Sequence, residues 1–322
     1  MDPPPPYQPL ADALARHREL RRVTVFGIDA TMDAPCSAIG GGQGWIISVS
    51  DGRNDASCVG DGQSVPQCIA FAGHDRDHLR HALCEQSAVP KDGVPPDWTT
   101  DLFQAATRLD ADISLAPVGR GTGVDALWLS SIDWGTSYLG VATSSGWSWT
   151  DIPLFVAYRM YQHVEVHDTS KLTGDTSFAF TATASDGGSG SGMIISHFTI
   201  VRPDGAQLIR DVTLPISILA WTWNHDEKRR ILRKHSSSPV MDVRHRPHIE
   251  VTLTPHFDAP RFLQLRVKTN RLPPKMRERF ACDEADTECS LHQAEAVLQM
   301  AGLWEWNSHT RKLEKFQERK EP

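Results

Sequence analysis

Residues 248–269 read HIEVTLTPHFDAPRFLQLRVKT, two alternating segments joined by a short turn-like stretch. Each segment places an apolar residue at every second position: Ile249, Val251, Leu253, Leu263, Leu265 and Val267. Because successive side chains of a strand point to opposite faces, the pattern predicts an antiparallel hairpin with one buried face. Folding back around residues 257–261 would place Glu250 beside Arg266 or Lys268, a cross-strand charge pair that needs no ligand to explain it.

Similar apolar or alternating segments extend over much of the chain. From about residue 113, short apolar or alternating runs such as ALWLSSIDW, SFAFTATA and MIISHFTIV recur between Gly, Ser, Asp and Pro. The segment RPDGAQ at 202–207 predicts a hairpin turn, in which Pro203 fixes φ and Gly205 supplies a positive φ. The segment SDGGSGSG at 185–192 predicts a longer tip between two strands. These signals together predict antiparallel β structure.

Helical periodicity occurs mainly towards the two ends of the chain. Residues 10–22 predict a helix that leads into a strand at 23–27, and residues 98–110 predict a second helix. Residues 290–303 predict a further helix with Ser290 as its N-cap, followed by a closing hairpin. We therefore expect an α+β fold that is predominantly antiparallel β, as a sheet or a sandwich, with a few flanking helices.

These changes between helical periodicity and strand alternation along the chain suggest three regions. Residues 1–112 form a mixed α/β region with a proline-rich start, and residues 113–280 form an antiparallel β-rich domain. Residues 281–322 form a disulfide-braced C-terminal helix and hairpin. Because the boundaries follow from composition alone, we expect their positions to be approximate.

Composition limits the class of protein. The chain has 322 residues, of which 40% are hydrophobic and 23% charged, as in folded globular domains. The net charge of −7 provides no excess of Lys and Arg for binding nucleic acid. No run of roughly 18 apolar residues occurs, so no transmembrane helix is expected. Attachment to a membrane surface or through a lipid anchor stays open.

Cysteine usage points to export. The chain has six cysteines, and none of them has the Cys-x2-Cys spacing typical of zinc sites. The expected bridges are Cys58–Cys68, Cys282–Cys289 and, as the remaining option, Cys36–Cys84. Disulfides persist in oxidising compartments, which predicts a periplasmic or extracellular protein, in a bacterium for instance. Because the first residues do not resemble a signal peptide, we expect Met1 to replace a removed leader. A cytosolic protein with buried thiols is the alternative.

The segment HVEVHD at 163–168 is the first candidate for chemistry. In a strand, His163, Glu165 and His167 share one face, and next-nearest residues lie roughly 6–7 Å apart, close enough for two of them to bind one zinc ion. The opposite face carries valines, which predicts that the core lies on that side. The favoured interpretation is therefore a solvent-facing strand surface without a metal.

Other histidines are further candidate metal ligands. A metal site on the strand would need a fourth group, such as His197 or His248. On a helix, the segment GHDRDHLRHALCE would bring its histidines within about 60° of one another. These histidines are His74, His78 and His81. However, Asp75 is the better helix N-cap, which leaves the first histidine outside the helix and argues against a metal there.

A basic segment is the second candidate. NHDEKRRILRKH begins with Asn224 and has Glu227 three residues later, a capping-box pattern. Its cations are Lys228, Arg229, Arg230, Arg233 and Lys234. Acids at the start and bases at the end stabilise a helix by themselves. In an acidic protein, the same cations would also suit an acidic partner or a lipid headgroup.

These observations favour a non-catalytic, exported recognition protein that binds another protein. An inhibitor or an immunity-type protein fits this class. Ten tryptophans agree with it, because Trp is enriched at binding hot spots, although it is also a common core residue. No cofactor is expected. The alternative is a metal-dependent hydrolase, in which His163, Glu165 and His167 hold zinc.

Overall fold

Most of the described chain is β-strand, with a few helices, as the alternation predicts. The computed structural model describes residues 7–29, 36, 39, 42–70, 75–85, 96–109, 112–118, 125–131, 137–144, 146–152, 160–187, 191–222, 248–272, 280 and 289–316. The strands form one connected mixed sheet, and a sandwich is not confirmed. Neighbouring strands are antiparallel except where Gln207 pairs with Trp149 in parallel.

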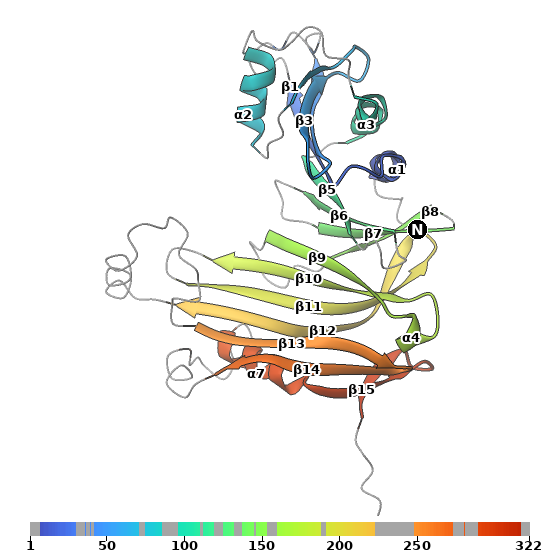
Figure 1. The fold of residues 1–322 in the computed structure, drawn as a ribbon, viewed down its shortest axis with the longest axis vertical. Helices are drawn as coiled ribbons and strands as arrows, with labels where there is room; N and C mark the ends of the chain where they lie inside the picture. The colour runs from blue at the N-terminus through green and yellow to red at the C-terminus, as the bar shows by residue number, and fades with distance from the viewer. Residues whose placement is uncertain are drawn as a thin grey trace, which may run out of the picture. The chain divides into compact units, whose positions relative to one another are not determined.

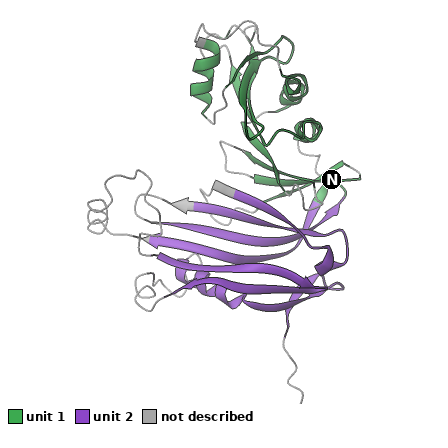
Figure 2. Cartoon of the chain, in the orientation of Figure 1, with its two compact units in different colours: residues 1–153, 205–207 green, residues 154–204, 208–322 purple. Residues whose placement is uncertain are grey.

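The chain divides into two compact units (Figure 2). Unit 1 contains residues 1–153 and 205–207, and unit 2 contains residues 154–204 and 208–322. This division differs from the boundaries near 112 and 280 that the sequence suggests. The strands after residue 112 extend the sheet of unit 1, and the C-terminal helix and hairpin belong to unit 2, while the division into three regions stays a prediction.

Unit 1 is an eight-stranded sheet with helices on both faces (Figure 1). Its strands are β1 (Arg22–Asp29), β2 (Gln43–Ser50), β3 (Asp55–Gly60), β4 (Gln67–Ile69), β5 (Ile113–Val118), β6 (Ala126–Ser131), β7 (Ser137–Thr143) and β8 (Gly146–Asp151). They follow the order β4-β3-β2-β1-β5-β6-β7-β8. Helices α1 (Gln8–Arg16) and α3 (Trp98–Ala106) cover one face; α2 (Arg76–Arg80), continued by the π-helix η1 (His81–Glu85), covers the other.

Local sequence explains where these helices begin and end. The α1 helix buries Leu10, Ala13 and Leu14, as its periodicity predicts. It ends at Arg16, earlier than expected, because Arg22 already pairs with Ser50 in the sheet. The predicted cap of α2 is present: the His78 backbone N–H donates to Asp75 Oδ1 at 2.8 Å.

Unit 2 is a meander, in which each strand pairs with the next one along the chain (Figure 1). Its strands are β9 (Met160–Asp168), β10 (Phe178–Gly187), β11 (Ser191–Asp204), β12 (Gln207–Thr222), β13 (His248–Ala259), β14 (Phe262–Arg271), β15 (Gly302–Asn307) and β16 (Lys312–Lys315). The short helix α4 (Ser170–Thr173) joins the first two strands, and α7 (Ser290–Gln299) packs on β13. At the predicted 202–207 turn, Gly205 has a φ of +61°.

The hairpin of residues 248–269 forms, but in a different register. Glu250 pairs with Arg271, and the charged atoms of these two residues lie 3.8 Å apart. Arg266 instead lies 3.5 Å from Asp258. The turn is tighter than expected and two bulges shift the ladder, so counting from the sequence misplaces the partners. Val267, an expected core residue, is 48% exposed, although it pairs with the buried Leu253.

The start of α7 also differs from the prediction. Ser290 is the first helical residue rather than the N-cap, and Cys289 occupies the cap position without a side-chain hydrogen bond. The Ser290 hydroxyl donates instead to Met193 Sδ on β11 at 3.9 Å. The helix buries Ala294 and Val297 against the sheet. Trp306 on β15 joins the same core and is 1% exposed.

Gly140 on β7 leaves space for the indole ring of Trp149. A Cβ atom at this position would lie 2.5 Å from Trp149 Cζ3 on the neighbouring strand. We expect Gly140→Ala to lower the free energy of unfolding by about 1–3 kcal/mol, because the buried ring has to move. Gly42→Ala is the matched control, since a Cβ there meets nothing within 4 Å. Urea unfolding of both variants checks this, and equal stability would contradict it.

Candidate functional site

The segment HVEVHD forms the second half of strand β9, as predicted. Val164 and Val166 are 3% and 2% exposed, so one face of the strand is core. On the other face, His163 and Glu165 are exposed. His167, the third candidate ligand, is only partly exposed. The expectation of a uniformly solvent-facing surface therefore fails at this last position.

His167 is held by protein groups on its own face of the sheet. Its Nε2 lies 2.8 Å from Thr181 Oγ1 on β10. Its ring lies 5.9 Å from the ring of Phe198 and 6.3 Å from that of Phe257, centroid to centroid. Burial lowers the pKa of His167, and the nearby Glu165 charge opposes this shift only in part. The sequence could not show these contacts, because two of the partners lie on β11 and β13.

The two proposed additional ligands do not approach these residues along the sheet. His197 pairs with Ala182, which in turn pairs with Val164, so His197 lies on the opposite face from His163. His248 is the first residue of β13, at the other end of that strand from Phe257, the residue that contacts His167. In the described part of the chain, no group of three His, Cys, Asp or Glu residues is arranged to hold a metal ion. The zinc site stays a prediction.

Replacing the two histidines separates the interpretations of β9. We expect His163→Ala to change stability by less than about 0.5 kcal/mol, as at other exposed positions. His167→Ala should cost about 1–2 kcal/mol, because it removes a hydrogen bond and two aromatic contacts. Urea unfolding measures both effects. One equivalent of zinc in protein purified without added metal, lost in the double variant, is the result that the hydrolase alternative requires.

The other candidates are only partly within the described residues. His78 in α2 and His81 in η1 are exposed, whereas His74 lies outside the described residues. Every residue of the predicted basic helix lies outside them as well: Lys228, Arg229, Arg230, Arg233 and Lys234. The partner-binding role of that segment stays a prediction.

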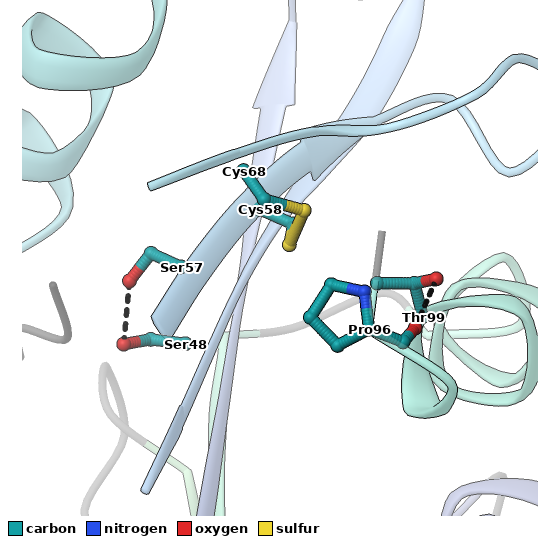
Figure 3. Close-up of a disulfide and its surroundings, with 6 residues drawn as sticks. All are labelled: Ser48, Ser57, Cys58, Cys68, Pro96 and Thr99. Atoms are coloured by element: carbon teal, nitrogen blue, oxygen red, sulfur yellow. Dashed lines mark hydrogen bonds between the residues drawn. A yellow bond between two sulfur atoms is a disulfide. The ribbon is translucent and has the colours of Figure 1, made fainter. Parts of the chain in front are cut away.

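Two disulfides brace unit 1 from opposite faces of its sheet. Cys58 on β3 is bonded to Cys68, its direct partner on β4 (Figure 3). Cys36 is bonded to Cys84 of η1. The first bridge lies in the core beneath α1 and α3, and the second lies in the core beneath α2. Cys289 is also disulfide-bonded, while its predicted partner Cys282 lies outside the described residues.

Arg311 forms a polar cluster in unit 2 that the sequence did not reveal. Its guanidinium donates to Asp211 Oδ2 from Nε at 3.0 Å and from Nη2 at 2.8 Å. It also donates to Asp175 and to Ser177 Oγ, each at 2.8 Å. The Asp211 side chain is 7% exposed. One side chain from the β15–β16 turn thus connects β12 to the segment before β10. The only local signal is a charged residue in a turn, which is common.

The cluster makes stability depend on pH. Burial raises the pKa of Asp175, but hydrogen bonds from Ser177 and Arg311 outweigh it and bring the value from 3.8 to about 2. Since the folded-state pKa is depressed, the stabilisation is present above pH 3.8 and is lost as the pH falls towards 2. We expect Asp175→Asn to flatten this part of the stability profile. Urea unfolding between these pH values tests it, and an unchanged slope would contradict it.

The comparisons with known proteins add no constraint. No protein-family model, no curated protein and no solved structure matches the chain. The fold and the site geometry are therefore the basis for any functional conclusion.

Proposed function

We propose that the protein is a non-catalytic, exported recognition protein that binds another protein, in the manner of an inhibitor or an immunity protein. The observation that carries export is the pair of disulfides in unit 1, Cys36–Cys84 and Cys58–Cys68. Both fit an oxidising compartment, of which the periplasm and the extracellular space are the candidates. Among the described helices, none is long and apolar enough to cross a membrane.

Strand β9 supports the recognition part of the proposal. Among the described strands it pairs with β10 alone, so it is an edge strand of the unit 2 meander. An edge strand presents backbone donors and acceptors to which an extended segment of another protein can add. His163, Glu165 and Asp168 are exposed along it and provide side-chain selectivity. The predicted basic helix would add an attraction for acidic partners that weakens as salt rises.

Export is tested by the redox state of the cysteines in the native host. Cells are fractionated with a thiol-trapping reagent present, and the protein is located by immunoblotting. The proposal expects the periplasmic fraction or the medium to contain the chain with Cys36, Cys58, Cys68 and Cys84 oxidised. A cytosolic chain with free thiols would refute export.

Recognition is tested by site-specific photocrosslinking in intact cells. A photoreactive amino acid replaces Glu165 on β9 or, as a matched control, the exposed Lys268 on β14. We expect one defined crosslinked protein from position 165 and not from position 268. The purified partner should then bind the full chain reversibly and remain chemically unchanged. Equal crosslinking at both positions would refute the edge as the binding surface, and turnover of the partner would refute the non-catalytic role.

A further inference from the structure

Unit 1 contains a half-open pocket of about 530 Å³ that none of the motifs above includes. It lies where the C-terminal half of α1 faces strands β5 to β8. Leu14, Leu127 and Trp147 form apolar walls, and the first two are 0% and 4% exposed. Arg18, Arg21 and Asp125 provide its charged groups. The volume falls within the range of about 300–1,000 Å³ that is usual for small-ligand sites.

The apolar part of the pocket is held in place before any ligand arrives. The Trp147 indole N–H donates to Asp12 Oδ1 on α1 at 3.0 Å, which ties β8 to the helix. Gln8 Nε2 donates to the same carboxylate oxygen at 3.1 Å. The ring of Trp149 lies 6.0 Å from that of Trp147 and restricts it further. A preformed wall lowers the entropy cost of binding.

The charged groups are arranged to accept one negative charge. Arg18 lies 3.5 Å from Asp125, but the two side chains are 80% and 63% exposed, so this ion pair is weak. Arg21 is exposed, and no ion pair or side-chain hydrogen bond joins its guanidinium to the described residues. An anion would therefore gain Arg21 without breaking a contact and would compete with Asp125 for Arg18. The Asp125 charge repels a dianion more strongly than a monoanion.

We propose that this pocket binds a ligand in which a carboxylate is joined to an apolar group. The apolar group packs against Trp147 and Leu127, and the carboxylate accepts hydrogen bonds from Arg21 and Arg18, since a guanidinium matches a carboxylate in a bidentate geometry. Two sources share this chemistry: a small organic acid, and the last residue of a polypeptide. The inference goes beyond the proposed function and does not depend on β9 or on export.

Calorimetric titration of the full chain tests the proposal and distinguishes the sources. The probes are decanoate, indole-3-propionate, a short peptide that ends in leucine with a free carboxylate, and the same peptide with an amidated end. We expect at least one probe with a free carboxylate to bind. If the peptide is the ligand, its amidated form should bind at least about tenfold more weakly than the form with the free carboxylate. Binding of the small acids alone assigns the first source, and binding of the peptide alone assigns the second.

Variants identify the pocket as the place of binding. Arg21→Gln should weaken the best probe by about tenfold or more, and Asp125→Asn should strengthen it, because a competing carboxylate is lost. Ala15→Trp, at an exposed helix position that lines the pocket, should block it without disturbing the core. Arg108→Gln, an exposed arginine outside the pocket, is the control and should change nothing. No binding of any carboxylate, or binding that Arg21→Gln and Ala15→Trp leave unchanged, would overturn the proposal.

Discussion

Replacing Arg311 by alanine is expected to lower the free energy of unfolding by about 3 kcal/mol, at the lower end of the range for breaking a buried ion pair. The loss is large because Asp211, 7% exposed, would keep its charge without its main partner. It is not larger because Arg202 Nε remains 3.5 Å from Asp211 Oδ1. Arg311 also lies 5.6 Å from the centroid of the Trp306 ring, so packing is lost with the charge.

Two further variants show whether the geometry of the guanidinium matters. Arg311→Lys keeps the charge but cannot donate to Asp211, Asp175 and Ser177 together, so it should recover less than about half of the loss. Arg266→Ala removes an ion pair whose side chains are 59% and 71% exposed, and should cost less than about 1 kcal/mol. Urea unfolding of the three variants tests this. A similar cost for Arg311→Ala and Arg266→Ala would mean that the cluster adds nothing beyond a surface pair.

Removing the Cys36–Cys84 disulfide should have the largest effect of any change considered. The bridge joins residues 48 positions apart, and chain entropy predicts a loss of about 4 kcal/mol when a loop of this size is opened. The Cys58–Cys68 bridge spans 10 positions, so its removal should cost about 3 kcal/mol by the same reasoning. The reason for the order is that a longer loop restricts the unfolded chain more.

The two bridges are compared by replacing each cysteine pair with alanines. Alanine avoids the added cost of a buried hydroxyl, since Cys36 and Cys58 are 5% and 0% exposed. Unfolding in urea without reductant gives the two losses, and the variant with all four cysteines replaced gives their combined effect. A greater loss from the shorter bridge would show that native-state packing around β3 and β4, rather than loop size, determines the stabilisation.

The sequence predicted what depends on neighbouring residues. Alternation identified the strands around Val164 and Ile249, and Gly205 marked a turn that does have a positive φ. The cap of α2 at Asp75 followed from side-chain chemistry alone. The register of the 248–269 hairpin did not follow, because a bulge adds a residue to one strand without a signal in the sequence.

Sites formed by residues far apart in the chain were missed. Arg311 contacts Asp211 across 100 positions, and Trp147 contacts Asp12 across 135. Each of these residues is ordinary in its own segment, and only the strand order brings the pairs together. His167 shows the same limit, since its environment depends on Phe198 and Phe257, which lie on strands that the alternation could identify but not place.

The assignment of residues 205–207 to unit 1 affects how the protein can be divided. Ala206 accepts a hydrogen bond from the Trp149 backbone N–H at 2.9 Å, and Gly205 accepts one from the Ser148 hydroxyl. A fragment that ends at residue 153 would lack this segment and leave the backbone of β8 without these partners. The two units are thus not modules that a single cut or a gene fusion at their boundary can exchange. Residues 205–207 of unit 1 lie within the sequence of unit 2, so neither unit corresponds to one uninterrupted stretch of the chain.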